Sequence, residues 1–458
     1  MRKMTIVRDK TFYKSVLSIM FPVALQQAIN MGVNMLDTMM LGSFGEVALS
    51  ASSLANQYYN FFVIFNLGII GGCSVLCAQY WGAGDRERVY ETFAMALRLS
   101  AGLAVLFAGI TWLFPAEIMR LYSPETAVIE AGTRYLKITT FVFLLHGLGF
   151  VLAQLMRSVG QARLGLVVSI VAFFVNLGSN YVVIFGKFGA PKMGIAGAAL
   201  GTLISRTAEF LLTFIYIFFI DRRLGLRVKN ILKNPSSDFY RNYFHLGAPV
   251  LVSDGLLGLG SNLVSVVLGH MGAAVVAANS VCMVVERMFS VVISGVSNAS
   301  SIITGSTLGR GEIEKACVQG ETFYLLSIVF GALAALMMYA VGPMTIRMYT
   351  LTPETVTVTR QLMRAYIVIT FFNAVQAIMT KGVLRGGGDT KFLMIADALF
   401  LWLLSVPAGA LTGLVLQWPA WAVLFCLRVD YIIKSVWCIA RLRSRKWIHV
   451  ADDIKVNV

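Results

Sequence analysis

A stripe of polar side chains runs along the first long apolar segment of the chain. Gln27, Asn30, Asn34 and Asp37 follow one another at intervals of three or four residues, so a helix would place them all on one face. Their oxygens could hold a sodium ion, and the Asp37 carboxylate could instead take up a proton. Because a polar stripe facing lipid would be costly, we expect it to face a cavity or neighbouring helices.

Polar residues also occur within later apolar segments. Asn176 and Asn180 are four residues apart and therefore share one face of a helix, and Thr202 lies on the next apolar segment. A plainer role stays open for each of the three, because amides and hydroxyls commonly join membrane helices through hydrogen bonds.

The composition requires a membrane around these segments. The 458 residues are 57% hydrophobic and only 13% charged, with a mean hydropathy of +0.75, whereas a soluble domain carries about 25% charged residues. A soluble enzyme is therefore excluded. The six cysteines are scattered without a CxxC spacing, so we expect neither a metal site nor a disulfide framework. The net charge of +15 fits Lys and Arg collected on the cytoplasmic face better than nucleic-acid binding.

About 20 apolar residues are needed to cross the hydrocarbon core, and the chain offers twelve such runs. They lie near residues 16–41, 49–78, 93–114, 135–156, 164–186, 194–220, 246–269, 275–304, 320–343, 362–384, 392–414 and 419–440. Most Lys and Arg residues fall in the loops that share a side with the two termini, which places both termini in the cytoplasm. We predict an all-α, multi-pass membrane protein with twelve transmembrane helices.

The two halves of the chain repeat one another at an offset of 227 residues. This offset aligns Pro22 with Pro249, Gly45 with Gly272 and the sequence WGAGDRERV at 81–89 with LGRGEIEKA at 308–316. Further on, MRSVGQAR at 156–163 matches LRGGGDTK at 384–391. Because each half holds six spans, the halves have the same orientation, and a central cavity is expected at their interface.

The repeat also predicts the domain organisation. We expect an N-terminal six-helix bundle at 1–220, a basic cytoplasmic linker at 221–245, a C-terminal bundle at 246–440 and a basic cytoplasmic tail at 441–458. No hydrophilic stretch is long enough for a nucleotide-hydrolysing domain, so transport driven by an ion gradient is the favoured function. The glycine-rich segment at 385–391 lacks the spacing and the preceding strand of a phosphate-binding loop, and we interpret it as a turn between two spans, with no nucleotide.

The second half carries its own charged candidates. The offset places Val264 opposite Asp37, so the carboxylate is not duplicated. Asp254 and Glu286 lie within later spans, where a charged side chain is a functional hypothesis by default. Because Glu286 is followed by Arg287, an internal ion pair is the alternative to a cation-attracting surface in the cavity.

Other charged side chains within the spans have structural explanations. Arg206 and Glu209 are three residues apart and could simply pair. Lys434 lies towards the inner end of the last span, where a long side chain can extend to the membrane surface, and we interpret it as structural.

Taken together, these features resemble the multidrug and toxic compound extrusion (MATE) family, in particular its DinF-like branch. The motifs concerned are Pro22 in the first span, the Asn34-x-x-Asp37-Thr38 cluster, WGAGD at 81–85 and RGGGDTK at 385–391. The resemblance covers essentially the whole chain. It implies a monomeric, cation-coupled antiporter of the prokaryotic plasma membrane, among its lipids, that exports organic and often cationic amphipathic compounds by alternating access. It implies no enzymatic activity and no cofactor other than the transported Na⁺ or H⁺.

The resemblance also assigns roles to residues. Asp37 matches the carboxylate that binds the coupling cation, with Asn34 beside it and Asn176, Asn180 and Thr202 as polar partners. Many DinF-like members have a second aspartate where this chain has Asn180, which implies a single coupling charge. In the NorM-like branch the coupling glutamate lies further along the seventh span than Asp254, so that role is not transferred.

The substrate cavity should be aromatic and adaptable, since the chain holds 21 Met and 30 Phe. Tyr58 and Tyr59 are candidates for holding cationic compounds over their rings, together with Gln27, Asn30, Asp254 and Glu286. A lipid-linked precursor flippase of the wider superfamily is the alternative function, although it should have a markedly cationic cavity. An intramembrane enzyme is a third class, but no catalytic constellation supports it.

Overall fold

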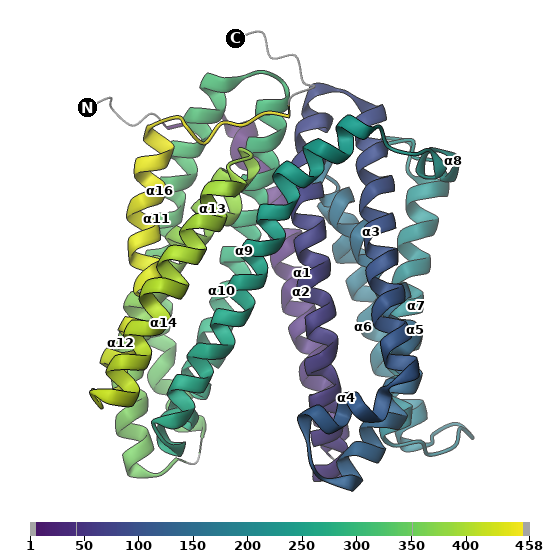
Figure 1. The fold of residues 1–458 in the computed structure, drawn as a ribbon, viewed down its shortest axis with the longest axis vertical. Coiled ribbons are helices and arrows are strands. Elements are labelled where there is room, and N and C mark those ends of the chain that lie inside the picture. Colours follow the sequence, from purple (N-terminus) through teal and green to yellow (C-terminus); the bar gives the residue numbers. More distant parts are fainter. Residues whose placement is uncertain (1–5, 43, 350, 452–458) are drawn as a thin grey trace. The chain divides into compact units, whose positions relative to one another are not determined.

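The computed structural model describes residues 6–42, 44–349 and 351–451, which are almost entirely helical (Figure 1). Within these residues eleven helical stretches are long and apolar enough to cross a membrane. The last predicted span, 419–440, is instead divided into α15 (Ala420–Leu427) and α16 (Val429–Arg443), which together complete the twelve membrane-spanning helices.

This division at Arg428 has a physical cause. The Asp430 amide N–H does not continue the helical ladder but donates to the Ser405 hydroxyl of a neighbouring helix, at 3.0 Å. Arg428 has φ −123° and ψ 14°, outside the helical range, and its guanidinium donates to the Tyr431 hydroxyl at 2.8 Å. The twelfth span is therefore present as predicted, with a break in its helix at Arg428.

The first half contributes six spanning elements and two short helices. The spanning elements are α1 (Lys10–Gly42), α2 (Glu46–Ala83), α3 (Arg86–Leu113), α5 (Thr126–Ser158), α6 (Ala162–Phe185) and α7 (Ile195–Ile215), which is continued by the π-helical η1 (Tyr216–Ile220). The short helices are α4 (Pro115–Tyr122) and α8 (Val228–Leu232).

The second half begins with α9 (Ser237–His270), α10 (Ala273–Gly309) and α11 (Ile313–Met348). Its fourth span joins α12 (Pro353–Ala377) to the π-helical η2 (Ile378–Leu384). The fifth span is formed in succession by α13 (Thr390–Asp397), η3 (Ala398–Ser405), α14 (Val406–Ala410) and η4 (Leu411–Val415). The matching turns at 156–163 and 384–391 each contain a glycine with positive φ, Gly160 at 82° and Gly388 at 86°.

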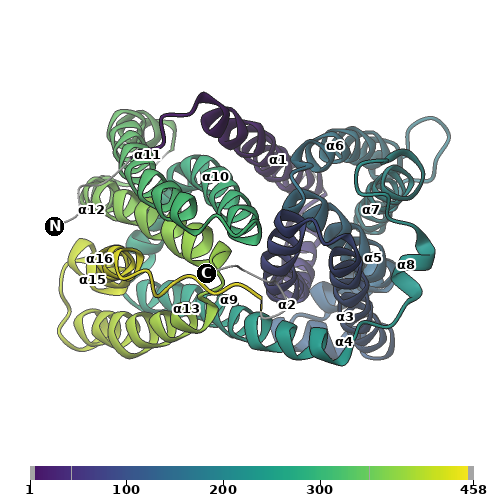
Figure 2. The same ribbon diagram turned by 90° about the horizontal axis from the view of Figure 1, so that it is seen from above.

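Contacts divide the chain into two compact units. Among the described residues, one unit holds 6–24, 78–85 and those between Asn242 and Ala451, and the other holds those within Leu25–Cys77 and Arg86–Arg241. In the second of these, α5 packs against α3 and α7, and α6 packs against α7 (Figure 2). A Cβ at Gly197 of α7 would lie 2.7 Å from the Val183 carbonyl oxygen, so a glycine is needed for this close helix contact.

In the other unit, the end of α2 crosses the end of α10 with backbones in contact. A Cβ at Gly82 would lie 2.1 Å from the carbonyl oxygen of Ser306, and a Cβ at Gly309 would lie 1.9 Å from that of Gln79. The offset of 227 residues aligns Gly82 with Gly309 and Gln79 with Ser306. The crossing is therefore symmetric with respect to the sequence repeat.

The last described residues cover this crossing. The Gln79 side chain is fully buried, donates to the His449 carbonyl at 3.1 Å and accepts from the Ala451 amide at 3.0 Å. The His449 amide donates to the Gly387 carbonyl at 2.7 Å, and the buried Trp447 ring lies over the same glycine. The tail thereby ties the end of α2 to the turn between η2 and α13.

Candidate cation-binding site

Asp37 lies on α1, half-buried against α6. Its Oδ1 accepts a hydrogen bond of 2.6 Å from Nδ2 of Asn180. In the described ranges, no Lys, Arg or His nitrogen lies within ion-pairing distance of this carboxylate. In the described part of the chain this neutral amide is the hydrogen-bond partner of the carboxylate, so Oδ2 is open to a further partner.

Asn180 is fully buried on α6, and its amide links Asp37 to Asn176. The same Nδ2 reaches Oδ1 of Asn176 at 3.2 Å, while Oδ1 of Asn180 has no hydrogen-bond partner among the described residues. That oxygen faces α7, where a Cβ at Gly201 would lie only 2.0 Å away. Because the two ends of an amide are a donor and an acceptor, the group can serve either an ionised carboxylate or a cation by turning over.

Thr202 follows Gly201 on α7, but its hydroxyl serves a different neighbour. It donates to the Ala198 carbonyl of its own helix at 2.9 Å and lies within hydrogen-bonding reach of the Tyr135 hydroxyl, as Asn56 does. Tyr135 of α5 is buried and interacts electrostatically with Asp37. Tyr135 and Asn56 are members of the cluster that the sequence did not reveal, since a single tyrosine or asparagine gives no local signal.

The rest of the predicted stripe is accessible. Gln27, Asn30 and Asn34 are exposed on α1, on the same face as Asp37. The neighbouring Gln26 is the buried one, and its Oε1 accepts from Arg157 of α5 at 2.6 Å. The structure therefore brings Asp37, Asn176 and Asn180 together and leaves the other three polar residues of α1 without a described contact to them.

Tyr58 and Tyr59 lie in an aromatic cluster of α2, α3 and α5. The Tyr59 hydroxyl and His146 Nδ1 are 2.6 Å apart, and the Tyr58 ring packs 5.4 Å from Phe107 and 5.9 Å from Phe143, centroid to centroid. Both rings are half-buried. Their position as walls of a substrate cavity stays a prediction.

Asp254 forms a two-pronged ion pair on the other unit. Its carboxylate oxygens lie 2.8 and 3.2 Å from the two terminal nitrogens of Arg385. Arg385 aligns with Arg157 in the matching turns, so each half has an arginine of the turn that reaches back to the start of its bundle, to Gln26 in one case and Asp254 in the other. The aligned turn sequences already showed that the arginine recurs, although not which residue it contacts.

Glu286 of α10 has an amide as its described partner, because Asn373 Nδ2 lies 3.3 Å from its Oε1. Arg287 is exposed and lies on a different side of the helix. The internal ion pair expected from the adjacent residues is therefore absent from the described contacts, because neighbouring residues on a helix do not face each other.

Lys434 is buried and does not extend to the membrane surface as expected. Only 1% of its side chain is exposed, and its Nζ lies 2.7 Å from Asp397 Oδ1 and 3.0 Å from Asp430 Oδ2. Ser253 of α9 donates to Asp397, and Ser405 contacts Asp430. Asp397 was missed by sequence reasoning, since its partner lies on another helix. The ammonium thus joins two spans of this unit, and Ser253 connects a third span to them through Asp397.

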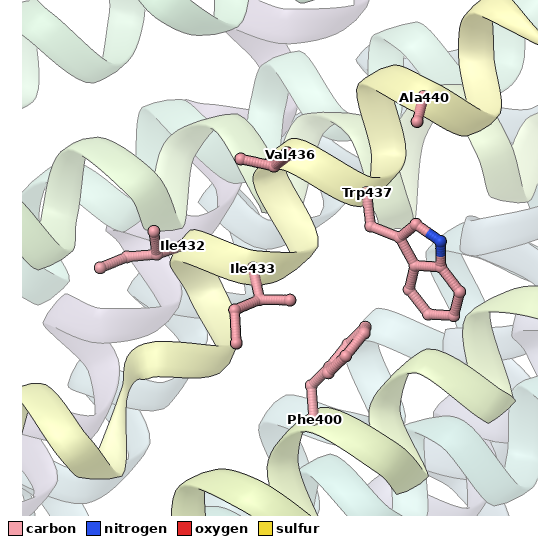
Figure 3. Close-up of a pocket in the computed structure, with 6 residues that line it drawn as sticks. All are labelled: Phe400, Ile432, Ile433, Val436, Trp437 and Ala440. Atoms are coloured by element: carbon pink, nitrogen blue, oxygen red, sulfur yellow. The ribbon is translucent and has the colours of Figure 1, made fainter.

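An apolar groove of about 450 Å³ lies between η3 and α16 (Figure 3). It is lined by Phe400, Ile432, Ile433, Val436, Trp437 and Ala440. The Phe400 and Trp437 rings meet edge to face, with their centroids 4.7 Å apart. With no carboxylate or amide in its walls, this groove lacks the ligands for a cation.

The chemistry of the Asp37 cluster suits a monovalent cation better than a resident metal. Within the residues described, no three His, Cys, Asp or Glu side chains gather as ligands for a metal ion. One carboxylate with neutral oxygens around it offers a single negative charge, which matches one Na⁺ or one proton.

Comparisons with known proteins agree with this architecture. The MatE family model matches residues 22–182 and 249–411, one match in each half. The probable multidrug resistance protein NorM of Thermotoga maritima is 24% identical over 438 residues, covering 95% of this chain and 93% of the relative. The multidrug resistance protein MdtK of Photorhabdus laumondii is 23% identical over 405 residues, covering 88% of each.

Solved structures show the same fold. The MATE transporter VcmN of Vibrio cholerae in its bent form has a TM-score of 0.84 at 17% identity, covering 96% of this chain and 99% of its own. An outward-facing multidrug resistance MATE family transporter of the MOP superfamily has a TM-score of 0.84 at 16% identity, covering 95% and 97%. Since the family model matches most of the sequence in two copies, the chain belongs to the MATE family of transporters.

Proposed function

We propose that this protein is an antiporter that exports organic, often cationic and amphipathic compounds in exchange for one Na⁺ or H⁺ bound at Asp37. The observation that carries the proposal is the kind of partner that the Asp37 carboxylate has. It lies in a membrane span, and its partner is the Asn180 amide rather than a fixed cation. The names of the relatives, multidrug resistance proteins of the same family, support export of such compounds.

The exchange needs the ion and the compound to prefer different states of the carrier. In the proposed cycle the coupling ion enters the outward-open protein at Asp37, and the Asn180 amide turns its oxygen towards a bound Na⁺ or keeps its N–H on the carboxylate otherwise. Ion binding changes α1, which holds Pro22 within its length and can bend there, and the compound leaves. A ligand with equal affinity for both states could not drive this step.

The test is gradient-driven efflux of ethidium from proteoliposomes, with a Na⁺ gradient and a pH gradient imposed separately. We compare wild type with Asp37→Asn, which keeps the shape of the side chain and the oxygen that Asn180 contacts. Asp9→Asn is the matched control, because Asp9 is an exposed aspartate that precedes α1 and, among the described residues, hydrogen-bonds to Thr11. We expect efflux with one of the two gradients, lost in Asp37→Asn and kept in Asp9→Asn.

Two results would overturn parts of this proposal. Undiminished efflux by Asp37→Asn would remove Asp37 from the coupling mechanism. No efflux by wild type under either gradient, with correctly inserted protein, would reject the antiporter and return attention to the lipid-linked precursor flippase.

A further inference from the structure

An ion pair on α7 lies beside the Asp37 cluster and has no role in the function proposed so far. Arg206 Nη1 is 2.6 Å from Glu209 Oε2, and 8% of Glu209 is exposed. Arg206 stands about halfway along the continuous span formed by α7 and η1. A guanidinium at this depth is costly to a membrane protein, so it needs a functional or structural reason.

The same helix contacts the cation site directly one turn earlier. Gly201 abuts the amide oxygen of Asn180, whose nitrogen binds Asp37. Arg206 follows Thr202 by four residues, about 6 Å along the helix axis and on the same face. It interacts electrostatically with Asp37 as well as with Glu209. Arg206 therefore pairs with Glu209 about one helical turn from the α7 residues beside the Asp37 cluster, and its charge acts on Asp37 as well.

The charges of this cluster do not balance. Asp37 and Glu209 bring two carboxylates, whereas Arg206 is the one charged side chain that acts on Asp37 in the described structure. The other titratable groups that face Arg206 are neutral in their ordinary forms; they are Tyr59 of α2 and Tyr135 and His146 of α5. A bound Na⁺ or proton at Asp37 would complete the charge balance.

We propose that Arg206 is a tethered counter-ion that exchanges partners between Glu209 and Asp37. This inference rests on the proposed function of Asp37. When a cation occupies Asp37, repulsion holds the guanidinium on Glu209, which is the arrangement in the structure. When the cation leaves, the guanidinium turns towards Asp37, so that the emptied carboxylate is not left without a counter-charge in the membrane. Arg206 is then a positioning residue that sets how tightly the site holds its ion.

The proposal predicts opposite effects for the two members of the pair. Arg206→Gln removes the competing charge, so Asp37 should bind its cation about tenfold more tightly. Glu209→Gln releases Arg206 to Asp37, so cation binding should weaken about tenfold. The double variant should lie between the two, and Arg206→Lys, which keeps the charge, should stay within about threefold of wild type. If the ion pair only stabilised α7, both single variants would change the cation affinity of Asp37 in the same direction.

Chemical labelling of Asp37 measures the affinity of the site for its cation without a transport assay. The purified full-length protein is treated with dicyclohexylcarbodiimide, which reacts with protonated carboxyl groups, and labelling of Asp37 is quantified by mass spectrometry. The proton concentration for half-labelling and the Na⁺ concentration for half-protection are measured, with Asp37→Asn as the background. Both should fall about tenfold in Arg206→Gln and rise about tenfold in Glu209→Gln. Thermal unfolding of each variant is measured alongside.

The outcomes separate this inference from the proposed function. Shifts of the same sign in both single variants, or no shift in either, would overturn the exchange of partners. If the single variants unfold, Arg206→Lys and the double variant test the exchange of partners instead. The exchange requires that both have half-labelling and half-protection concentrations near those of wild type. Opposite shifts in a protein that shows no gradient-driven efflux would keep the exchange and reject the antiporter.

Discussion

The carboxylates within the spans fall into two groups, which differ in what compensates their charge. In the second half, Asp254 is held by both terminal nitrogens of Arg385, and Asp397 and Asp430 share the buried Lys434. Asp37 in the first half and Glu286 in the second are instead held by amides, those of Asn180 and Asn373. A fixed cation occupies the position that an exchangeable ion would need. We therefore expect a membrane carboxylate to exchange an ion only where the protein provides no permanent cationic partner, as proposed for Asp37.

The largest effect is expected at the fixed cation. Lys434→Met should leave two buried carboxylates without compensation and lower the free energy of unfolding by about 3–5 kcal/mol, measured by thermal unfolding in detergent. Lys434→Arg should keep most of the stability. Adding Asp397→Asn and Asp430→Asn to Lys434→Met should restore much of it, because no unpaired charge then remains. A Lys434→Met protein as stable as wild type would break the contrast between carboxylates paired with a fixed cation and carboxylates held by an amide.

A smaller effect is expected at the exchangeable site. Gly201→Ala would place a methyl group 2.0 Å from the Asn180 amide oxygen and push the amide away from Asp37. The concentration of driving ion for half-maximal efflux should rise about tenfold, equivalent to about 1.4 kcal/mol, with little loss of stability. Gly178→Ala on α6 is the matched control, since a Cβ there meets nothing within 4 Å. Equal effects at the two glycines would contradict an amide-held site.

The smallest effect is expected at Thr202. Its hydroxyl proton is already used by the Ala198 carbonyl, so Thr202→Val should change the half-maximal ion concentration by about twofold or less, through a weaker hold on Tyr135. Efflux at graded ion concentrations measures this. A loss as large as that of Gly201→Ala would show that Thr202 binds the ion itself, and the site would then include α7 as a direct ligand.

Local patterns predicted the helices, and distance along the chain limited the rest. The apolar runs, the repeat and the turn glycines at 160 and 388 are properties of short segments, and the structure confirms the helices and the turns. The hydrogen bond between Asp37 and Asn180 joins residues 143 apart, so periodicity could place each residue on a face but could not pair them. That pairing was expected only through the family resemblance.

The same limit explains which details of the structure the sequence did not show. The break at Arg428 depends on the hydroxyl of Ser405, which belongs to another helix. Lys434 was expected to reach the membrane surface because its two carboxylate partners were not recognised as one group. Asp397, 37 residues earlier in the sequence, gives no sign of this contact.

The crossing of Gly82 and Gly309 has a consequence for the origin of the chain. Two aligned glycines each face the backbone of the other copy, at Ser306 and Gln79, which are themselves aligned. In a two-fold homodimer of a single six-helix half, the two contacts would have been made by the same glycine of each subunit. Any larger residue at that position would have clashed with the partner backbone in both contacts. The contact therefore has the geometry of an isologous dimer interface, now held within one polypeptide whose copies are free to diverge.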